Sequence, residues 1–239
     1  MNTPLICITT FNEAESIHTL VRSLARLGGH VLVIDGGSWD GTQVVAAHAG
    51  AQVVGGLEKR GIGTCLMEGW RIALAKGHDG VIQIDAGGSH NPDDVLHFVE
   101  RAAMQDKPDV IIGSRFRSKA LYNNVNGDPY RPSLSKLAAW MMNYAQSGAH
   151  YSDWTSGFRY FNRKALELLI KRDYITDMHT WQIEVLAYAG EMGLHIVEVP
   201  ISYTAGRSSF NRKIAYEAFT TWLHVMNHVG WVGSKLHHE

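Results

Sequence analysis

The sequence predicts an α/β fold in which a mostly parallel, Rossmann-like central sheet is flanked by helices. Two patterns in the 239 residues predict it. Short runs rich in β-branched residues alternate with stretches in which apolar residues recur at helical spacing. Polar, glycine-containing turns follow several of the short runs directly. Strands separated by helices of about 10–15 residues are typical of βαβ units, whose strands pair in parallel.

The first half of the chain is the more regular one. Strands are predicted there at Leu5–Thr9, Val31–Ile34, Gln52–Val54, Gly80–Ile84 and Asp109–Ile112. Helices are predicted between them at Glu13–Leu27, Thr42–Ala49, Gly63–Ala75 and Pro92–Met104. The first helix carries an apolar residue at every third or fourth position and ends at Gly28 and Gly29, which form a helix-stop signal.

The second half is less regular, but no linker divides it from the first. A polar loop is predicted at Arg117–Tyr130, and a turn followed by a strand at Asp153–Tyr160. One further strand is predicted at His195–Ile201. Helices are predicted at Leu134–Gln146, Lys164–Lys171, Trp181–Glu191 and, as a final amphipathic helix, Ile214–Val229. The whole chain is therefore predicted to form a single domain.

Composition narrows the functional classes. The formal net charge is −1 at pH 7, so no overall positive field attracts nucleic acid, although a local basic patch stays compatible with the sequence. No stretch reaches the roughly 18 consecutive apolar residues of a membrane span, and the N-terminus lacks the basic region of a secretory signal. Cys7 and Cys65 lie in apolar surroundings and are predicted to be buried free thiols in a reducing compartment. We therefore expect a cytoplasmic protein whose membrane contact is at most peripheral.

Polar side chains follow several of the predicted strands. They belong to TTFNE after the first strand, DGGS at Asp35, DAG at Asp85 and GSR ending at Arg115. In a parallel α/β sheet, ligands bind outside the carboxyl ends of the strands. Carboxylates at that edge can hold a ribose hydroxyl, a base edge or a cation that bridges a diphosphate. For Asp35 a second interpretation stays open, in which its carboxylate only caps the following helix.

These segments are part of a longer ordered set, which reads TTFNE, DGGSWDGT, KRGIGT, DAGGSHNP, GSRF, TSGFR, WQIE and EVPISY. In this order and at this spacing, the set resembles the family 2 glycosyltransferases over roughly residues 3 to 210. It is especially similar to the dolichol- and polyprenyl-phosphate mannosyl- or glucosyltransferases. The resemblance implies a single GT-A domain over 1–239, with a nucleotide-sugar-binding half (1–116), an acceptor-binding half (117–213) and a C-terminal amphipathic helix and tail (214–239).

Carried over by position, the resemblance implies a role for each motif. The implied nucleotide-sugar site consists of Thr10, Asn12, Glu13, Asp35, Lys59, Arg60, Gly61, Gly63 and Asp85. Asp85, Arg115 and Glu184 are the implied catalytic residues, and Asp85 is the implied ligand of Mg²⁺ or Mn²⁺. His90 in GGSHNP also matches the family and is expected to orient the diphosphate.

Two positions depart from the family pattern. Gly36 and Gly87 stand where the family usually has aspartate, in Asp-Asp-Gly and in the Asp-Ala-Asp element. Asp85 alone can suffice, because Mg²⁺ commonly binds through one or two carboxylates plus phosphates and waters. A second explanation is that the chain is a weak or inactive transferase. A third is that basic residues replace the charge of the metal, with Arg60, Arg115, Arg131, Arg207, Arg212 and Lys213 as candidates.

Cations gather in two segments of the second half, Gly113–Lys136 and Gly206–Lys213. A phosphate monoester has a second pKa of about 6 and is anionic at neutral pH, so a phosphate acceptor needs cations rather than a general base. Arginine suits this role because its guanidinium binds phosphate in fork geometry. For each cation alone a solvated loop is the competing interpretation, and Arg159 and Asp153 are equally compatible with structural pairing. The predicted acceptor site comprises Arg115, Arg131, Ser135, Arg207 and Arg212, and the resemblance adds Gln182, which matches the family's Q-x-E helix beside the acceptor.

The sequence supports three hypotheses of function. The first is an inverting transferase that moves a hexose from a GDP- or UDP-linked donor to a polyprenyl phosphate. The second keeps the donor but changes the acceptor to a glycan, a small metabolite or a modified nucleobase, in which case Glu184 or another acid acts as general base. The third is a non-catalytic module that binds nucleotide sugars. The stripe from Leu137 to Tyr144 is expected in the core, with an isoprenoid tail or a membrane surface as its alternative partner, and the final helix is expected to dock on the body or on a second copy.

Overall fold

The computed structural model describes residues 3–117, 122–123, 130–146, 150–178, 180–204 and 212–228. Its strands are β1 Leu5–Thr10, β2 His30–Asp35, β3 Gln52–Gly55, β4 Gly80–Asp85, β5 Val110–Ser114, β6 Tyr122–Asn123, β7 Arg159–Asn162, β8 Ile196–Pro200 and β9 Tyr203–Thr204. Its helices are α1 Ala14–Arg26, α2 Thr42–His48, α3 Ile62–Ala75, the 3₁₀ helix η1 Pro92–Asp94, α4 Val95–Ala102, α5 Tyr130–Ala145, α6 Arg163–Leu169, α7 Trp181–Glu191 and α8 Arg212–His228.

Seven strands form one sheet in the order β3-β2-β1-β4-β7-β5-β8. β1 pairs in parallel with β2 and β4, β2 with β3, and β5 with β8. β7 runs antiparallel to both β4 and β5 and lies between them. The predicted mostly parallel sheet is thus confirmed, and it contains one antiparallel strand that the sequence pattern did not reveal.

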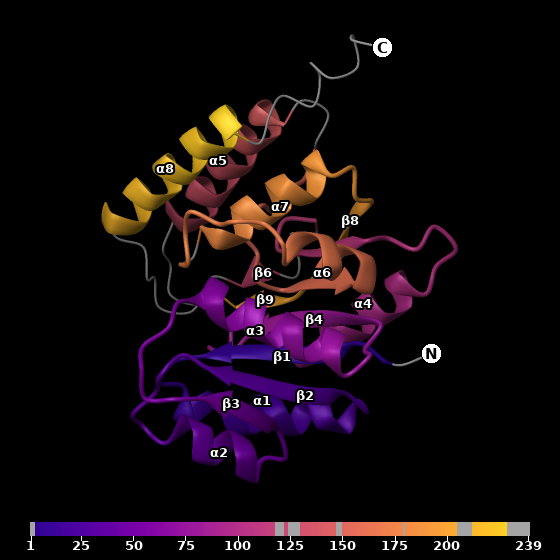
Figure 1. Ribbon diagram of the computed structural model, residues 1–239, viewed down its shortest axis with the longest axis vertical. Helices are drawn as coiled ribbons and strands as arrows, with labels where there is room; N and C mark the ends of the chain where they lie inside the picture. The colour runs from indigo at the N-terminus through magenta and orange to yellow at the C-terminus, as the bar shows by residue number, and fades with distance from the viewer. Residues whose placement is uncertain are drawn as a thin grey trace.

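Side chains alternate between the two faces of the sheet along each strand. Both faces carry apolar side chains, and helices cover both of them. Leu5 and Cys7 of β1 belong to the apolar cluster that includes α3, α6 and α7. Ile6 and Ile8 of the same strand belong to the opposite cluster, with α1, α2 and α4. Figure 1 shows α1 and α2 at one end of the molecule, and α5 and α8 side by side at the other end.

Local sequence accounts for where several helices begin and end. α1 ends as predicted: Gly28 has a φ of 78°, and the amides of Gly28 and Gly29 donate to the carbonyls of Ala25 and Leu24. This double bond pattern is the Schellman cap, which glycine favours because it has no Cβ to strain the left-handed backbone. The predicted helix Pro92–Met104 differs, because it consists of η1 followed by the shorter α4.

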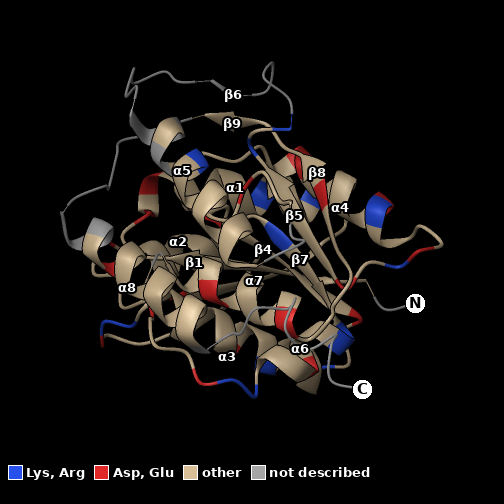
Figure 2. Ribbon diagram, turned by 90° about the horizontal axis from the view of Figure 1, so that it is seen from above, with Lys and Arg blue, Asp and Glu red and all other residues tan. Residues whose placement is uncertain are grey.

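Charged residues of both signs are interspersed over the described part of the molecule, in line with the nearly balanced net charge (Figure 2). Within the described ranges, no helix combines the length and the hydropathy that crossing a bilayer requires. One edge of the sheet differs from the rest by the polar residues in its loops, which follow β1, β2, β4 and β5.

Candidate active site

A pocket of about 360 Å³ opens at the carboxyl edge of the parallel strands. Its walls come from the loops after β1, β2, β4 and β5, the start of α3, β9 and the turn before β7. Because β7 is antiparallel, its amino end lies beside the carboxyl ends of β4 and β5 and brings Thr155–Gly157 to this edge. The lining residues are Thr9, Thr10, Phe11, Glu13, Gly36, Arg60, Gly61, Ile62, Cys65, Asp85, Ala86, Gly87, Ser89, His90, Arg115, Thr155, Ser156, Gly157 and Tyr203.

The structure brings together about half of the residues predicted for the donor site. Those that line the pocket are Thr10, Glu13, Arg60, Gly61 and Asp85, joined by Arg115 from the predicted acceptor side. The other predicted donor residues lie in the same loops but outside the lining: these are Asn12, Asp35, Lys59 and Gly63. Their contacts show what holds the loops in place.

Asn12 ties the loop after β1 to the loop after β2. Its backbone has a positive φ of 56°, a conformation that asparagine tolerates better than most residues. Its amide donates to Ser38 Oγ at 2.7 Å, and its Oδ1 accepts from the Trp39 amide at 3.1 Å. Asn12 thereby positions the neighbouring pocket residues Phe11 and Glu13.

Asp35 organises the loop after β2 from a fully buried position. Its Oδ1 accepts from the amides of Gly37 and Ser38 and from Gln43 Nε2, and its Oδ2 accepts from Ser38 Oγ. It is Asp40 whose Oδ1 accepts from the Thr42 amide in the first turn of α2. Neither of the two interpretations of Asp35 includes this loop-holding role, and its contact with a nucleotide base stays a prediction.

The glycines at 61 and 63 are explained by tight packing. A Cβ at Gly63 would lie 2.6 Å from Trp181 Cδ1 and 2.8 Å from Asp177 Oδ1, and a Cβ at Gly61 would also collide with Asp177. Asp177 takes the place of a helix cap, because its carboxylate accepts from the amide and hydroxyl of Thr64 at the start of α3. The amino end of α3 is thus already engaged by a carboxylate of the chain itself.

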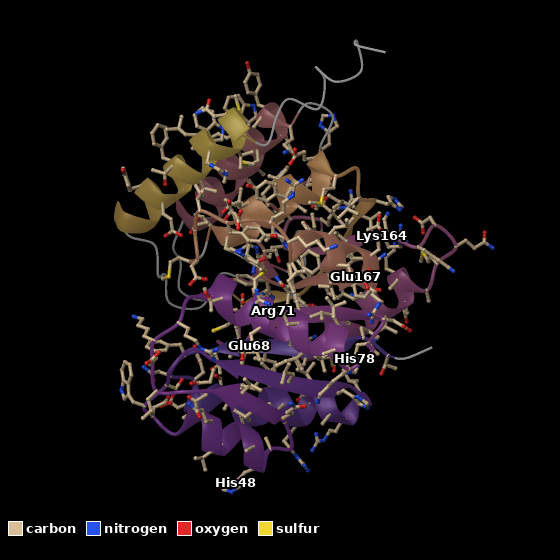
Figure 3. The ribbon with its side chains drawn as sticks, viewed as in Figure 1. His48, Glu68, Arg71, His78, Lys164 and Glu167 are labelled. Carbon is tan, nitrogen blue, oxygen red and sulfur yellow. The ribbon has the colours of Figure 1, made fainter. Side chains whose placement is uncertain are left out.

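Arg60 and Lys59 hold the loop that precedes α3. Arg60 pairs with Glu68, which is labelled on α3 in Figure 3, and its Nη2 donates to the Asp35 carbonyl at 2.7 Å. The Lys59 ammonium lies 5.0 Å from the centre of the Phe11 ring, a cation–π contact. These contacts join the third loop to the first two, and Arg60 remains at the pocket wall.

Asp85 presents a carboxylate to the pocket from the end of β4. It pairs with Thr9 in the sheet register, and its side chain is 51% exposed. His90 Nε2 lies 3.4 Å from Asp85 Oδ2, which agrees with the expectation that His90 belongs to this site. A Cβ at Gly157 would lie 2.5 Å from the same oxygen, so the absence of a side chain at 157 makes room for the carboxylate.

The pocket fits a divalent cation that is held jointly with a diphosphate. No set of three or more His, Cys, Asp or Glu side chains gathers as metal ligands in the parts of the chain that the structure describes. Mg²⁺ typically takes only one or two carboxylates and completes its shell with phosphates and water. The lining offers Asp85 and Glu13, and three buried polar atoms of lining residues have no hydrogen-bond partner among the described residues: Thr10 Oγ1, Arg60 Nε and His90 Nδ1.

Arg115 also lines the pocket and is bound to a fully buried aspartate. Its Nε and Nη2 donate to the two carboxylate oxygens of Asp153, both at 2.7 Å. The guanidinium also lies 5.2 Å from the ring of Tyr203. Burial alone would raise the pKa of Asp153, but the adjacent Arg115 outweighs it and holds this pKa below its ordinary value. Asp153 is therefore structural, and it fixes the orientation of Arg115.

Arg159 lies below this pair and is fully buried. It does not pair with a carboxylate among the described residues: its Nη1 and Nη2 donate to the carbonyls of Gln182 and Trp154. Burial lowers the pKa of Arg159 to about 10. These contacts are neither the expected pairing with a carboxylate nor a contact with the pocket. Arg159 instead joins the turn before β7 to α7.

The predicted acceptor residues are only partly brought to the pocket. Ser135 accepts from Thr155 Oγ1 at 3.4 Å and so lies behind the wall next to Arg115. Gln182 is buried and accepts from Gln83 Nε2 at 2.9 Å, which places it beneath the lining. Arg207 lies outside the described residues, and so do the side chains of Arg131 in α5 and Arg212 in α8.

Glu184 is not part of the pocket lining. It is fully buried on α7, where its carboxylate accepts from the amides of Ile175 and Thr176, and His224 Nε2 lies 3.6 Å away. Burial raises the pKa of Glu184 above its usual range. These contacts fix the segment that leads into α7. A role of Glu184 as a base stays a prediction, and its position supports a structural role.

Residues outside the predicted set complete the pocket. Tyr203 packs edge-on against His90, the neighbour of Asp85, and contacts Arg115, so it lies between these two parts of the lining. Thr155 accepts from Arg115 Nη2, and Gly157 accommodates Asp85. These residues stand within the motifs TSGFR and EVPISY, but nothing in the sequence showed that an antiparallel strand would carry them to this edge.

Comparisons with known proteins agree with this geometry. The model of glycosyl transferase family 2 matches residues 5–169. A polyprenol monophosphomannose synthase from Mycolicibacterium smegmatis is 28% identical over 208 residues, covering 84% of this chain and 77% of that protein. An undecaprenyl-phosphate mannosyltransferase from Micrococcus luteus is 28% identical over 227 residues, which is 90% of each chain. A glucosyl-3-phosphoglycerate synthase from Mycobacterium tuberculosis, crystallised with Mn²⁺, UDP and phosphoglyceric acid, superposes with a TM-score of 0.73 at 20% identity, covering 95% of this chain and 79% of that one.

The family match covers more than half of the chain and includes β1, β2, β4, β5 and the turn before β7, which together carry most of the pocket. The structural likeness, at 20% identity, confirms the GT-A fold. The chain therefore belongs to glycosyl transferase family 2 and is a glycosyltransferase.

Proposed function

We propose that this enzyme transfers a hexose from a GDP- or UDP-linked donor to a polyprenyl phosphate, with inversion at the anomeric carbon. The observation that carries the proposal is a single pocket whose lining combines the carboxylates of Asp85 and Glu13 with Arg115, which Asp153 holds in place. Two relatives, each 28% identical, are named for the transfer or synthesis of mannosyl polyprenyl phosphates, and this supports the choice of acceptor.

The part of the pocket wall around Asp85 is the proposed donor side. Asp85, at the end of β4, would hold Mg²⁺ or Mn²⁺ together with the diphosphate of the donor. Such an ion, when bound, stabilises the negative charge that develops on the leaving diphosphate. Thr10, Arg60 and Gly61 line the same wall and would contact the nucleotide, with Asn12, Asp35, Lys59 and Gly63 holding the loops around it.

The part of the pocket wall around Arg115 is the proposed acceptor side. Arg115 is oriented by Asp153, so its charge stands ready to bind an anionic phosphate without reorganisation. A phosphate nucleophile needs no general base, because it is already ionised near pH 7. This agrees with a pocket whose lining does not include Glu184. Arg131, Ser135, Gln182, Arg207 and Arg212 remain proposed parts of this side.

A small phosphorylated acceptor is the second candidate. The structural neighbour from Mycobacterium tuberculosis was crystallised with phosphoglyceric acid, which also offers a phosphate to its binding site. Arg115 would bind that phosphate as readily as a lipid-linked one. The two candidates differ in the group attached to the phosphate, and only an assay with both acceptors separates them.

Peripheral contact with a membrane accompanies the lipid acceptor in this proposal. The expectation that the stripe from Leu137 to Tyr144 lies in the core is wrong for three of its residues, because Leu137, Trp140 and Tyr144 are 51%, 66% and 60% exposed. Trp140 stacks on Tyr144, and on the adjacent α8, Phe219 is 50% exposed. Exposed aromatic rings on paired helices are typical of surfaces that lie in a lipid–water interface. Cys7 and Cys65 are both free and buried, which is compatible with the proposed cytoplasmic location. A second copy of the chain on the same face is the competing occupant.

The test is a transfer assay with a short polyprenyl phosphate in detergent, the common radiolabelled nucleotide sugars, and Mn²⁺ or Mg²⁺. We expect label in the lipid fraction, with the anomeric configuration opposite to that of the donor. Asp85→Asn is the matched negative control, since it removes the charge and keeps the shape. Label in 3-phosphoglycerate alone would favour the second candidate. The proposal is wrong if neither acceptor is labelled from any donor.

A further inference from the structure

We infer that Glu13 supplies the second carboxylate of the cation site, in place of the aspartate that Gly87 replaces. The inference deepens the proposed function and rests on its nucleoside diphosphate donor. Gly87 follows Asp85 by two residues and removes one carboxylate from the usual Asp-Ala-Asp element. The structure shows which side chain stands beside the vacated position.

Glu13 lies directly beside position 87. Among the described residues, its two chain neighbours aside, a Cβ added to Gly87 would meet one atom within 4 Å, and that atom is Glu13 Oε1 at 3.4 Å. A side chain at position 87 would therefore extend toward the Glu13 carboxylate. Glu13 reaches this place from the loop after β1, while Asp85 reaches the pocket from the end of the adjacent parallel β4.

The Glu13 carboxylate is oriented by contacts on its other side. Its Oε2 accepts from Ser16 Oγ at 2.8 Å, and its backbone amide donates to Thr42 Oγ1 at 2.8 Å. Its backbone carbonyl accepts from the amides of Ser16 and Ile17 at the start of α1. One carboxylate oxygen is thus held by a hydroxyl, and the other faces Gly87. No Lys or Arg among the described residues pairs with Glu13.

Two further groups in the same lining indicate a polar ligand. Thr10 Oγ1 and His90 Nδ1 are buried and have no hydrogen-bond partner in the described part of the chain. Thr10 is 6% exposed and His90 is 7% exposed, and both line the pocket with Glu13 and Asp85. A buried polar atom without a partner is costly, so such atoms commonly await a ligand or an ordered water. A hydrated cation with a diphosphate supplies donors and acceptors for both.

The two carboxylates also suit the charge of the cation. A divalent ion bound to Asp85, Glu13 and a diphosphate has the one-or-two-carboxylate shell that Mg²⁺ prefers. An aspartate at position 87 in addition to Glu13 would add a third negative charge to the same wall, and like charges raise each other's pKa. Glu13 and an aspartate at 87 are therefore alternatives, which makes the inference testable by exchange.

The experiment compares the wild-type chain with Glu13→Gln, with Gly87→Asp, and with the double variant Glu13→Gln/Gly87→Asp. Mn²⁺ binding is measured by electron paramagnetic resonance of the free ion, with saturating UDP and separately with saturating GDP. The affinity for each nucleotide is measured by calorimetry in EDTA. Glu15→Gln, an exposed glutamate on α1, is the matched control.

We expect Glu13→Gln to weaken Mn²⁺ binding about tenfold or more and to leave the metal-free nucleotide affinity within about twofold. The double variant should recover most of the loss, and Glu15→Gln should show none. Recovery by the second substitution also shows that the single variant folds.

Three results would overturn the inference. The first is wild-type Mn²⁺ binding by Glu13→Gln, and the second is a double variant that remains as weak as the single one. The third is a loss of nucleotide affinity in EDTA as large as the loss of Mn²⁺ binding, which would assign Glu13 to the nucleotide. If the wild-type chain binds neither nucleotide, the proposed donor chemistry fails and the inference fails with it. Normal wild-type binding with an unaffected Glu13→Gln removes the inference alone.

Discussion

Replacing Asp153 by asparagine should destabilise the protein strongly, although asparagine has nearly the same shape. Asp153 is fully buried and accepts from Arg115 through the backbone amide, Nε and Nη2, and from the Thr155 amide. In Asp153→Asn the amide group cannot accept from one of the guanidinium nitrogens. Arg115, itself 8% exposed, then keeps its charge without a counter-charge.

The size of the effect follows from the burial of the pair. Removing one partner of a buried ion pair typically costs about 3–5 kcal/mol, because the other charge is left uncompensated. We expect the lower end, about 3 kcal/mol, because Arg115 borders the pocket and retains its contacts with Thr155 and the Tyr203 ring. In a chain of this length, each kcal/mol lowers the melting temperature by about 2–4 °C, so a fall of about 6–12 °C is expected.

The assay is urea denaturation of the wild-type chain, Asp153→Asn, Arg115→Met and the double variant Asp153→Leu/Arg115→Met. The double variant should lose less stability than Asp153→Asn, because it leaves no buried charge. The pKa of Asp153 is lowered in the folded state, so its contribution is present above the ordinary aspartate pKa of about 3.9 and is lost as the pH falls below it. Asp153→Asn should therefore flatten this acid limb. A loss below about 1 kcal/mol, or an unchanged acid limb, would refute the reasoning.

Three further substitutions test the site. Gly157→Ala would place its Cβ 2.5 Å from Asp85 Oδ2, so metal-dependent donor binding should fall about tenfold by calorimetry, and unchanged binding would contradict the packing argument. Gly63→Ala collides with the Trp181 ring edge and should lower the free energy of unfolding by about 1–3 kcal/mol in urea, whereas a neutral result would show that α3 can shift. Glu184→Gln should retain most of its transfer activity in the lipid assay, because this carboxylate binds backbone amides outside the pocket lining. A folded but inactive Glu184→Gln would instead support the hypothesis that Glu184 acts as the general base.

Local sequence patterns predicted much of the fold. Apolar periodicity located α1, and the Gly28–Gly29 stop ended it within one residue of the observed bound, because helix termination by glycine is a local backbone property. For α7 the predicted bounds equal the observed bounds, Trp181–Glu191. Asp85 and Arg115 were predicted to lie at one site, because each follows a strand and the carboxyl ends of parallel strands share one edge of the sheet. Both residues line the pocket.

The sequence was less informative where the same residue type can either hold a loop or face a ligand. Asp35 and Asp85 both end a strand, yet Asp35 is fully buried in its own turn while Asp85 is half exposed in the pocket. Glu184 is likewise in a family motif and is buried away from the lining. A carboxylate that holds a loop and one that faces a ligand differ only in their surroundings, which nearest neighbours in the sequence do not specify.

By itself the sequence determined the alternation of strands and helices, the edge at which the site lies, and the loss of a carboxylate at Gly87. Only the tertiary structure decided that β7 enters the sheet antiparallel, so that Gly157 accommodates Asp85, and that Glu13 stands beside Gly87. The physical reason is the range of the forces involved. Helix periodicity, caps and turns depend on residues a few positions apart, whereas the pairing of β7 with β4 joins segments about 80 residues apart through hydrogen bonds and burial that exist only in the folded chain.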